Sequence, residues 1–292
     1  MPMQAFELTW GAHDLKMGQR TLIMGILNVT PDSFSDGGHY FDLQDAVAQG
    51  KKLVADGADI LDIGGESTRP FSDAITIDEE IRRVVPVIER LSGHIDVPIS
   101  IDTTKAAVAE QALAAGASMI NDISALRLDP RLTEVAADHG VPVILMHMQG
   151  TPGSMQVDPT YDDLIGEIKA FLSDAVAKAV QGGIARDHLI VDPGIGFGKT
   201  FQHNLEILNK LKLFADLELP VLVGSSHKAF IRNLLKPPEA KDLSPEAPVV
   251  ETGTQATVAA AVLNGTHIIR VHDVATTRAT LKIIDAIKNS RS

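Results

Sequence analysis

Asp59–Gly64 reads DILDIG, and Val97–Asp102 reads VPISID. Each is a short and nearly continuous apolar run, which is typical of a strand buried on both faces of a parallel sheet. Between them lies Asp78–Leu91, where apolar residues recur at intervals of three and four, as in a helix packed on one side. This strand–helix–strand unit predicts a parallel sheet covered by helices.

The same unit repeats along the chain. The apolar runs of strand length are Leu22–Asn28, Asp59–Gly64, Val97–Asp102, Ser118–Asp122, Val141–His147, Leu189–Asp192, Pro220–Gly224 and His267–His272. Ala-rich helical patterns lie between them, including Asp42–Asp56, Thr104–Ala115 and Asp162–Gln181. Eight such units in 292 residues favour an α/β fold closed into a (β/α)8 TIM barrel, which typically takes about 250 residues. A doubly wound open sheet is the alternative.

Residues 1–20 fall outside this repeat. Apolar residues alternate with polar ones on either side of Gly11, at Phe6, Leu8, Trp10, Leu15 and Met17. We expect an N-terminal β-hairpin that closes the bottom of the barrel, with Trp10 serving in packing. The chain would then be one domain over residues 1–292, with the hairpin in 1–20 and the barrel in 21–289. Lys236–Pro248, rich in proline and charge, is expected to be an exposed loop.

Composition argues against several classes of protein. Lys and Arg number 26 against 38 Asp and Glu, so the net charge is −12, and there is no basic block of the kind that nucleic-acid binding requires. The absence of cysteine excludes disulfides, thiolate metal sites and a Cys nucleophile. No apolar run approaches the ~18 residues of a membrane span, and Met1–Arg20 has no signal-peptide core. We therefore expect a cytoplasmic protein that acts on small molecules, without nucleic-acid or membrane partners.

Polar residues end the apolar runs or follow them closely. They are Asn28, Glu66 with Arg69, Asp102, Asn121 with Asp122, His147, Asp192, Lys228, and Arg270 with His272. Because active sites of parallel barrels lie at the carboxyl ends of the strands, this rim is the predicted active site. The connections over residues 29–41 and 65–76 are long for a barrel, and loops of that kind are often active-site lids.

The rim residues fall into two chemical sets. The carboxylates and amide of Asp102, Asn121 and Asp192 suit a heterocycle rich in N–H donors, such as a 2-amino-4-oxopyrimidine ring. The basic residues suit a phosphate or diphosphate, and they are Arg69, Lys228, Arg270 and His272. The sequence therefore predicts a site with a polar ring at one end and an anion at the other.

Several segments, in order, resemble the dihydropteroate synthase family of pterin-binding enzymes over residues 22–287. They are Gly25–Gly38, Gly57–Pro70, Ser100–Lys105, Asn121–Ile123, Leu145–His147, Val191–Lys199 and Arg270–Val274. The resemblance implies a transferase of folate biosynthesis that is a homodimer and a sulfonamide target. It implies condensation of 6-hydroxymethyl-7,8-dihydropterin diphosphate with 4-aminobenzoate to give 7,8-dihydropteroate and diphosphate, with Mg2+ as cofactor. The implied mechanism is SN1-like, with diphosphate leaving before the aryl amine attacks.

The resemblance also implies a function for each matching residue. The pterin would be bound by Asp102, Asn121, Met146, Asp192, Phe197 and Lys228. The diphosphate would be bound by Thr68, Arg69, Arg270 and His272, and Mg2+ by Asn28. The aminobenzoate would be bound by Ser33, Phe34, Pro70 and Ala229. The implied catalytic residues are Asp32, Asp102, Lys228 and Arg270.

Three residues depart from the family pattern. Ser226-His227-Lys228-Ala229 stands where the family usually has Ser-Arg-Lys-Ser, and Phe71 replaces a glycine. The position of Ala229 borders the carboxylate of the aminobenzoate in the family. We therefore expect normal pterin binding with weaker binding of aminobenzoate and sulfonamides.

Two other functions stay open at this point. Corrinoid-dependent methyltransferases contain a related pterin-binding barrel and would keep Asp102, Asn121 and Asp192, but they have little use for two long lids. A barrel that binds pterin without turning it over would be compatible with His227 and Ala229. Such a binder would need neither the basic set nor Asn28.

Overall fold

The structure, a computed structural model, describes residues 4–30, 43–67 and 74–290. Within these ranges eight parallel strands form one sheet in the order β8-β7-β6-β5-β4-β3-β10-β9. Their bounds are β3 Leu22–Asn28, β4 Ile60–Gly64, β5 Ile99–Asp102, β6 Met119–Asp122, β7 Val143–Met146, β8 Leu189–Asp192, β9 Leu222–Val223 and β10 Ile268–Val271. A parallel bridge between Val191 and Val221 joins β8 to the segment that enters β9. The sheet therefore meets itself, which confirms the predicted barrel against an open sheet.

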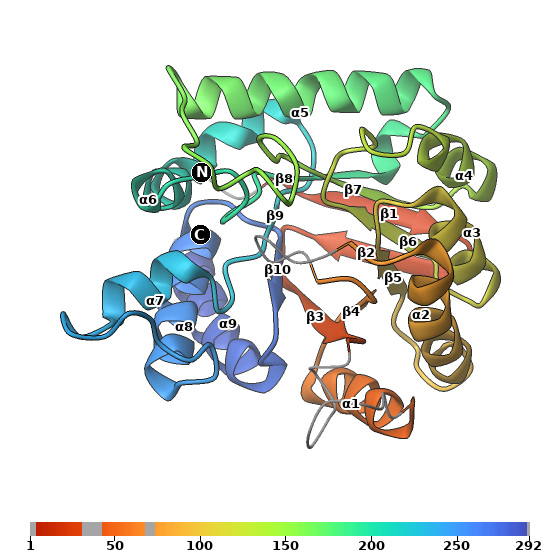
Figure 1. Cartoon of the computed structure of the whole chain (residues 1–292), viewed down its shortest axis with the longest axis horizontal. Helices are drawn as coiled ribbons and strands as arrows, with labels where there is room; N and C mark the ends of the chain where they lie inside the picture. Colours follow the sequence, from red (N-terminus) through yellow and green to blue (C-terminus); the bar gives the residue numbers. More distant parts are fainter. Residues whose placement is uncertain (1–3, 31–42, 68–73, 291–292) are drawn as a thin grey trace.

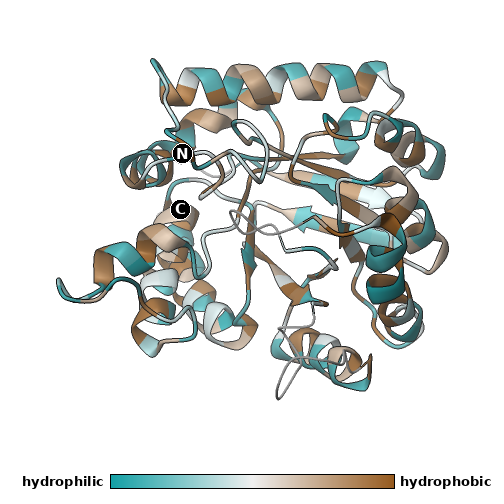
Figure 2. Ribbon diagram, viewed as in Figure 1, coloured by the Kyte–Doolittle hydropathy of each residue, from teal (hydrophilic) through white to brown (hydrophobic). Residues whose placement is uncertain are grey.

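Helices surround the strands on the outside of the barrel (Figure 1). They are α1 Leu43–Asp56, α2 Ile77–Ser92, α3 Ala106–Ala114, α4 Arg131–His139, α5 Leu164–Gln181, α6 Phe201–Lys210, α7 Ala229–Leu235, α8 Pro248–Leu263 and α9 Val274–Asn289, with 3-10 turns at Arg186–His188 and Leu211–Leu217. In Figure 2 the ribbons of the outer helices alternate between hydrophobic and hydrophilic colours, as expected of helices with one buried face. In the described part of the chain, none of them is long and apolar enough to cross a membrane.

The bottom of the barrel is closed by the N-terminal hairpin, as predicted. Strands β1 (Phe6–Trp10) and β2 (His13–Met17) pair antiparallel. Their buried residues pack against inward side chains from seven of the barrel strands. The cluster contains Leu8, Trp10, Leu15, Met17, Leu22, Met24, Ile60, Met119, Ile144, Ile190, Leu222 and Ile268. The indole N–H of Trp10 donates to the carbonyl of Ser118 at 2.7 Å. The ring of His188, before β8, contacts the carbonyl of Thr9 at 3.3 Å. The hairpin thus seals the barrel with apolar contacts and directed hydrogen bonds.

A polar layer lies directly above this apolar layer. Side chains of a strand alternate between its two faces, so residues two positions apart face the same way. Two residues beyond the inward residues Ile60, Met119, Ile144, Ile190 and Ile268 come Asp62, Asn121, Met146, Asp192 and Arg270. The same strands that build the core therefore carry polar side chains into the barrel at their carboxyl ends.

The seventh strand is shorter than the sequence indicated. Only Leu222–Val223 forms strand β9, whereas Pro220–Gly224 was the expected range. Pro220 has no N–H to give to a neighbouring strand, although its carbonyl accepts from Val191 N at 3.0 Å. Lys228 lies beyond the strand, on the connecting loop, as the residue that precedes α7.

Candidate active site

The centre of the polar layer is an arginine held between two carboxylates. Nε of Arg270 donates to Oδ2 of Asp62 at 2.6 Å, and its Nη2 donates to Oδ2 of Asp102 at 2.6 Å. The side-chain amide of Asn121 donates to the same oxygen of Asp62 at 3.1 Å. The guanidinium of Arg270 thereby links β10 to β4 and β5, and Asn121 joins β6 to the same group of residues through Asp62.

Asp62 was missed in the sequence analysis. It lies inside the apolar run of β4 and is completely buried. A buried carboxylate requires a charged or hydrogen-bonding partner. An aspartate within an otherwise apolar strand was therefore the signal that could have identified it.

Burial shifts the ionisation of three groups around this arginine. Desolvation raises the pKa of Asp102 to about 7, against the opposing effect of Arg270. Desolvation raises the pKa of Asp192 to about 6, although the N–H of Gly194 donates to its Oδ1 at 2.7 Å and favours the charged form. Desolvation lowers the pKa of Lys228 to about 8, and the charge of Arg270 acts in the same direction. Two carboxyls and an amine thus change charge near neutral pH, a property that is common in active sites.

An apolar wall lies beside these groups. Met146 and Phe197 belong to a small cluster that also contains Ile123, Met148 and Met155. Nζ of Lys228 lies 4.0 Å from the centroid of the Phe197 ring, which is a cation–π contact. A flat wall with polar groups at its edge suits a planar ring with polar edges.

The loop that carries Phe197 is tied to the end of β7 by a buried lysine. Nζ of Lys199 contacts Nδ1 of His147 at 2.7 Å and donates to the carbonyls of His147 and Phe197 at 3.1 and 2.9 Å. Desolvation lowers the pKa of His147 to about 2, so its ring is neutral and Nδ1 can accept a hydrogen bond from Nζ of Lys199. A Cβ at Gly194 would lie 2.0 Å from the carbonyl of His147, so only glycine fits this close approach.

Two of the predicted rim residues do not point into the barrel mouth. His147 follows the inward Met146 and packs outward against the ring of Phe171, with centroids 4.8 Å apart. Asp122 follows the inward Asn121 and accepts from the N–H groups of Ser124 and Leu126 at 2.7 and 2.6 Å, which forms the turn after β6. The prediction that these two side chains project into the site is wrong, because each is one residue past an inward position.

Glu66 also has a structural contact. Its carboxylate accepts from Nζ of Lys105 at 2.8 Å and from the N–H of Ile75 at 2.9 Å. Lys105 in turn binds the buried Glu80 of α2 at 2.6 Å. These contacts anchor both ends of the loop after β4 to the body of the barrel.

The basic end of the site lies between β9 and β10. His272 follows β10, and its Nδ1 is 2.9 Å from Oγ of Ser226. Asn28 ends β3 and is partly exposed beside Gly64. Ala229, which is the first residue of α7, comes directly after Lys228. Other assigned residues, Asp32, Ser33, Phe34, Thr68, Arg69, Pro70 and the variant Phe71, lie outside the described residues.

Comparison with known proteins places this geometry in a family. Residues 24–272 match the model of the pterin binding enzymes. Dihydropteroate synthase from Synechocystis sp. is 46% identical over 270 residues, which are 92% of this chain and 91% of that protein. The chain belongs to the dihydropteroate synthase family.

Solved structures of that family share the fold. The Yersinia pestis dihydropteroate synthase in a sulfonamide drug complex superposes with a TM-score of 0.90 at 43% identity, covering 98% of this chain and 100% of that one. The Xanthomonas albilineans dihydropteroate synthase with 4-aminobenzoic acid gives 0.88 at 43% identity, covering 98% and 99%. In this chain the six residues assigned to the pterin all lie at the mouth of the barrel, on β5 to β8 and on the loops that follow β8 and β9.

The clamp on Arg270 provides a test of stability. In Asp62→Asn the guanidinium loses one of its two charged partners, and we expect the free energy of unfolding to fall by about 2–4 kcal/mol. Urea unfolding followed by circular dichroism measures this change. Asp216→Asn is the control, since its carboxylate is exposed and forms a surface pair with Lys169, and it should change stability by less than about 0.5 kcal/mol. Equal stability of the two variants would contradict the importance of Asp62.

Proposed function

We propose that this chain is a dihydropteroate synthase that joins 6-hydroxymethyl-7,8-dihydropterin diphosphate to 4-aminobenzoate and releases diphosphate. The observation that carries the proposal is the polar layer of the barrel, in which Asp62, Asp102 and Asn121 surround Arg270. Family membership supports it, as do related structures whose ligands are 4-aminobenzoic acid and 7,8-dihydropteroate.

The pterin ring binds among the buried acids and the apolar wall. Asp192 accepts the ring N–H and the exocyclic amine, and Asn121 adds an amide that can both donate and accept. Lys228 donates to an acceptor on the ring, while Met146 and Phe197 cover its face. Charge-assisted hydrogen bonds of this kind contribute about 1.5–3 kcal/mol each.

The diphosphate binds at the basic end. Arg270 and His272 bind its oxygens, together with Thr68 and Arg69 on the second long loop. Asn28 holds Mg2+, which takes oxygen ligands and commonly combines one or two protein oxygens with water and substrate phosphates. A single partly exposed amide oxygen at the mouth fits that pattern. The metal, when bound, neutralises the charge that develops on the leaving diphosphate.

The reaction breaks the bond between the pterin methylene carbon and the diphosphate oxygen. Positive charge then develops on the methylene and the ring, and the carboxylate of Asp102 stabilises it. The C–O electron pair leaves with the diphosphate, the lone pair of the aminobenzoate amine forms the new C–N bond, and the proton that this nitrogen loses passes to the released diphosphate, which is a base. Asp32, Ser33, Phe34, Pro70 and Ala229 hold the aminobenzoate and keep water from reaching the cation.

A diphosphate-release assay with purified protein, Mg2+ and both substrates tests this function. We expect release that depends on aminobenzoate and yields dihydropteroate, and loss of turnover in Arg270→Ala. Methyl transfer from methyltetrahydrofolate to a corrinoid protein without diphosphate release would indicate a methyltransferase instead. Pterin binding without either reaction would indicate a non-catalytic binder.

Three further properties are part of the proposal. The chain is a single domain over residues 1–292, works as a homodimer and is located in the cytoplasm, as the family resemblance and the composition suggest. Its partners are the two small-molecule substrates, and it binds neither nucleic acid nor membranes. Size-exclusion chromatography with light scattering tests the dimer.

The raised pKa of Asp192 predicts that pterin binding depends on pH. A carboxyl with a pKa of about 6 is ionised above that pH and protonated below it, so its ability to accept two N–H groups is lost as the pH falls. We expect the affinity for a pterin measured by calorimetry to fall between about pH 7 and pH 5. Asp192→Asn should reduce affinity about 10- to 100-fold at pH 7.5 and remove the part of the pH dependence centred near pH 6, whereas a part from Asp102, with its pKa of about 7, should remain. A variant that kept both the affinity and the pH dependence would contradict the assignment.

The Ala229 position predicts a gain of function. Ala229→Ser restores a hydroxyl at the start of α7, where the family binds the aminobenzoate carboxylate. We expect the variant to bind aminobenzoate and a sulfonamide about 3- to 10-fold more tightly, since one added hydrogen bond contributes about 0.5–1.5 kcal/mol. Pterin affinity, measured in the same calorimetric series, is the internal control and should not change. Unaltered sulfonamide affinity would show that Ala229 does not limit this site.

A further inference from the structure

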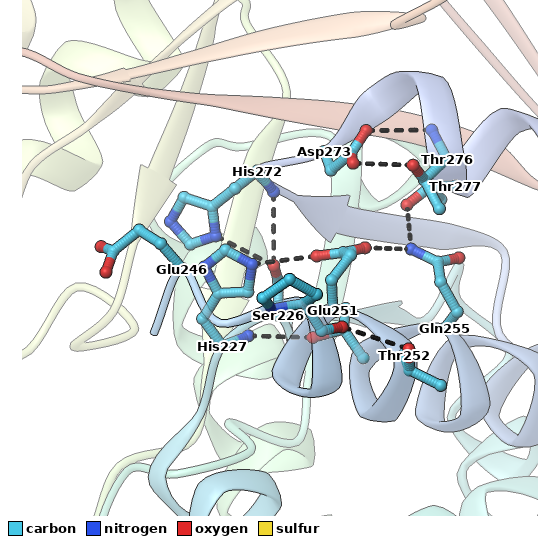
Figure 3. Close-up of polar contacts among 12 residues, drawn as sticks. Ser226, His227, Glu246, Glu251, Thr252, Gln255, His272, Asp273, Thr276 and Thr277 are labelled. Atoms are coloured by element: carbon cyan, nitrogen blue, oxygen red, sulfur yellow. Dashed lines mark hydrogen bonds and ion pairs between the residues drawn. The ribbon is translucent and has the colours of Figure 1, made fainter. Parts of the chain in front are cut away.

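Two imidazole rings are stacked at the basic end of the site. The rings of His227 and His272 have centroids 4.7 Å apart and an interplanar angle of 11°. Figure 3 shows the two rings together, with Ser226 and Glu251 at their edges. The loop before α7 and the end of β10 thus meet through two side chains that can each gain a proton.

The ring of His227 is held by a carboxylate from α8. Its Nε2 lies 2.9 Å from Oε2 of Glu251, and both side chains are about four-fifths buried. Because a carboxylate only accepts, Nε2 of His227 carries the proton of this hydrogen bond. The other oxygen of Glu251 accepts from Gln255, which also donates to Thr277 of α9 at 3.0 Å. The carboxylate therefore has a fixed position between two helices.

The backbone of His227 is also fixed in an unusual conformation. Its φ is +58°, a region that residues other than glycine seldom adopt. Its N–H donates to Oγ1 of Thr254 at 3.2 Å, and its carbonyl accepts from Arg232 at 2.6 Å. Such a conformation persists where surrounding contacts hold it, and it directs the imidazole onto His272.

We propose that His227, oriented by Glu251, is a positioning residue that holds the His272 ring for the diphosphate and makes the affinity for diphosphate depend on the protonation of the imidazole pair. The inference rests on the proposed function, because His272 is a diphosphate residue only there. Ser226 holds one edge of the His272 ring and His227 covers its face, so the ring has one orientation.

The charges around the pair explain why its protonation matters. Glu251 stabilises a cation on His227, whereas Arg232 on α7 and the neighbouring Lys228 oppose it. Glu246, on the loop before α8, and Asp273, which caps α9 through Thr276, are the other charged groups drawn around the rings in Figure 3. An imidazole changes charge between about pH 5 and 8, unlike an arginine, which stays charged. An anion that binds beside the rings therefore favours their protonated forms.

The test is calorimetric titration of inorganic diphosphate, with Mg2+, into the full-length protein between about pH 6 and pH 8.5. Diphosphate itself changes protonation with pH, but this contribution is the same for all variants and cancels when their affinities are compared. As the pH rises, the diphosphate affinity of the native chain should fall, and this fall should be about threefold or more larger than the fall measured for His227→Arg. An effect of this size is within what linkage allows, since one linked proton changes affinity by at most about tenfold per pH unit. His94→Arg, the same exchange at an exposed position at the other end of the barrel, should keep the native pH dependence.

Glu251→Gln is the second variant and does not depend on the folding of His227→Arg. It keeps the shape of the side chain but removes the charge that stabilises a cation on His227. We expect diphosphate affinity about 3- to 10-fold lower than native at pH 7.5, with recovery toward the native value at pH 6, which a merely structural defect would not show.

The outcomes separate this inference from the proposed function. If the native chain turns over its substrates, either of two results overturns the inference and leaves the synthase activity standing. One is that the pH dependence of diphosphate affinity in His227→Arg is identical to that of the native chain. The other is that Glu251→Gln has unchanged diphosphate affinity. Failure of the native chain both to bind diphosphate and to release it from the pterin substrate overturns both.

Discussion

The interaction on which the site depends is the buried contact of Arg270 with Asp62 and Asp102. Placing a guanidinium inside a barrel is costly unless its donors are matched, because the charge loses its hydration. Two carboxylates at 2.6 Å, from β4 and β5, supply that match, and the amide of Asn121 on β6 donates in turn to the carboxylate of Asp62. These charges also act on one another: Arg270 lowers the pKa of Asp102, whereas Asp62 raises it. The central charges of the mouth, those of Asp62, Asp102 and Arg270, thus belong to strand residues.

Closure of the barrel makes this possible. The apolar layer formed with the hairpin fills the lower half of the barrel, so water cannot reach the polar layer from below. Asp192 lies two positions further along its strand at low solvent exposure, and Asp102 ends the neighbouring β5, which explains why desolvation is the first cause of their pKa shifts. Lys228 reaches the same buried layer from the loop after β9, and desolvation is the first cause of its pKa shift too. Ionisable groups that change charge near neutral pH follow from the alternation of strand side chains above a sealed core.

Much of this could be predicted from the sequence, because apolar runs of strand length are a direct signal of a parallel sheet. The eight strands and the hairpin follow from the pattern alone, and the position of Asn121 and Asp192 at the mouth follows from their place at strand ends. The outward direction of Asp122 and His147 depends on which residue of each run faces inward, and a run that is apolar on both faces does not reveal its phase.

Contacts between distant segments were the part that the sequence could not provide. Asp62 and Arg270 are 208 residues apart, and His227 meets Glu251 only because α7 and α8 pack together. A departure from a family motif, such as His227, can be seen in the sequence, but its partner cannot. The structure adds the carboxylate, and with it a chemical reason for an imidazole at this position.

The two ends of the anion site consequently differ in kind. Arg270 has a permanent charge that two buried carboxylates hold in place, so its contribution to binding is nearly constant with pH. His272, by contrast, is held by the hydroxyl of Ser226 at one edge of its ring and by the stacked ring of His227 on its face. Under the proposed function, a leaving diphosphate gains negative charge as its bond to the pterin breaks, and the groups that stabilise it would have to be in place before that charge develops. Contacts within the barrel would fix these groups in advance, through two carboxylates at Arg270 and through a hydroxyl and a stacked ring at His272.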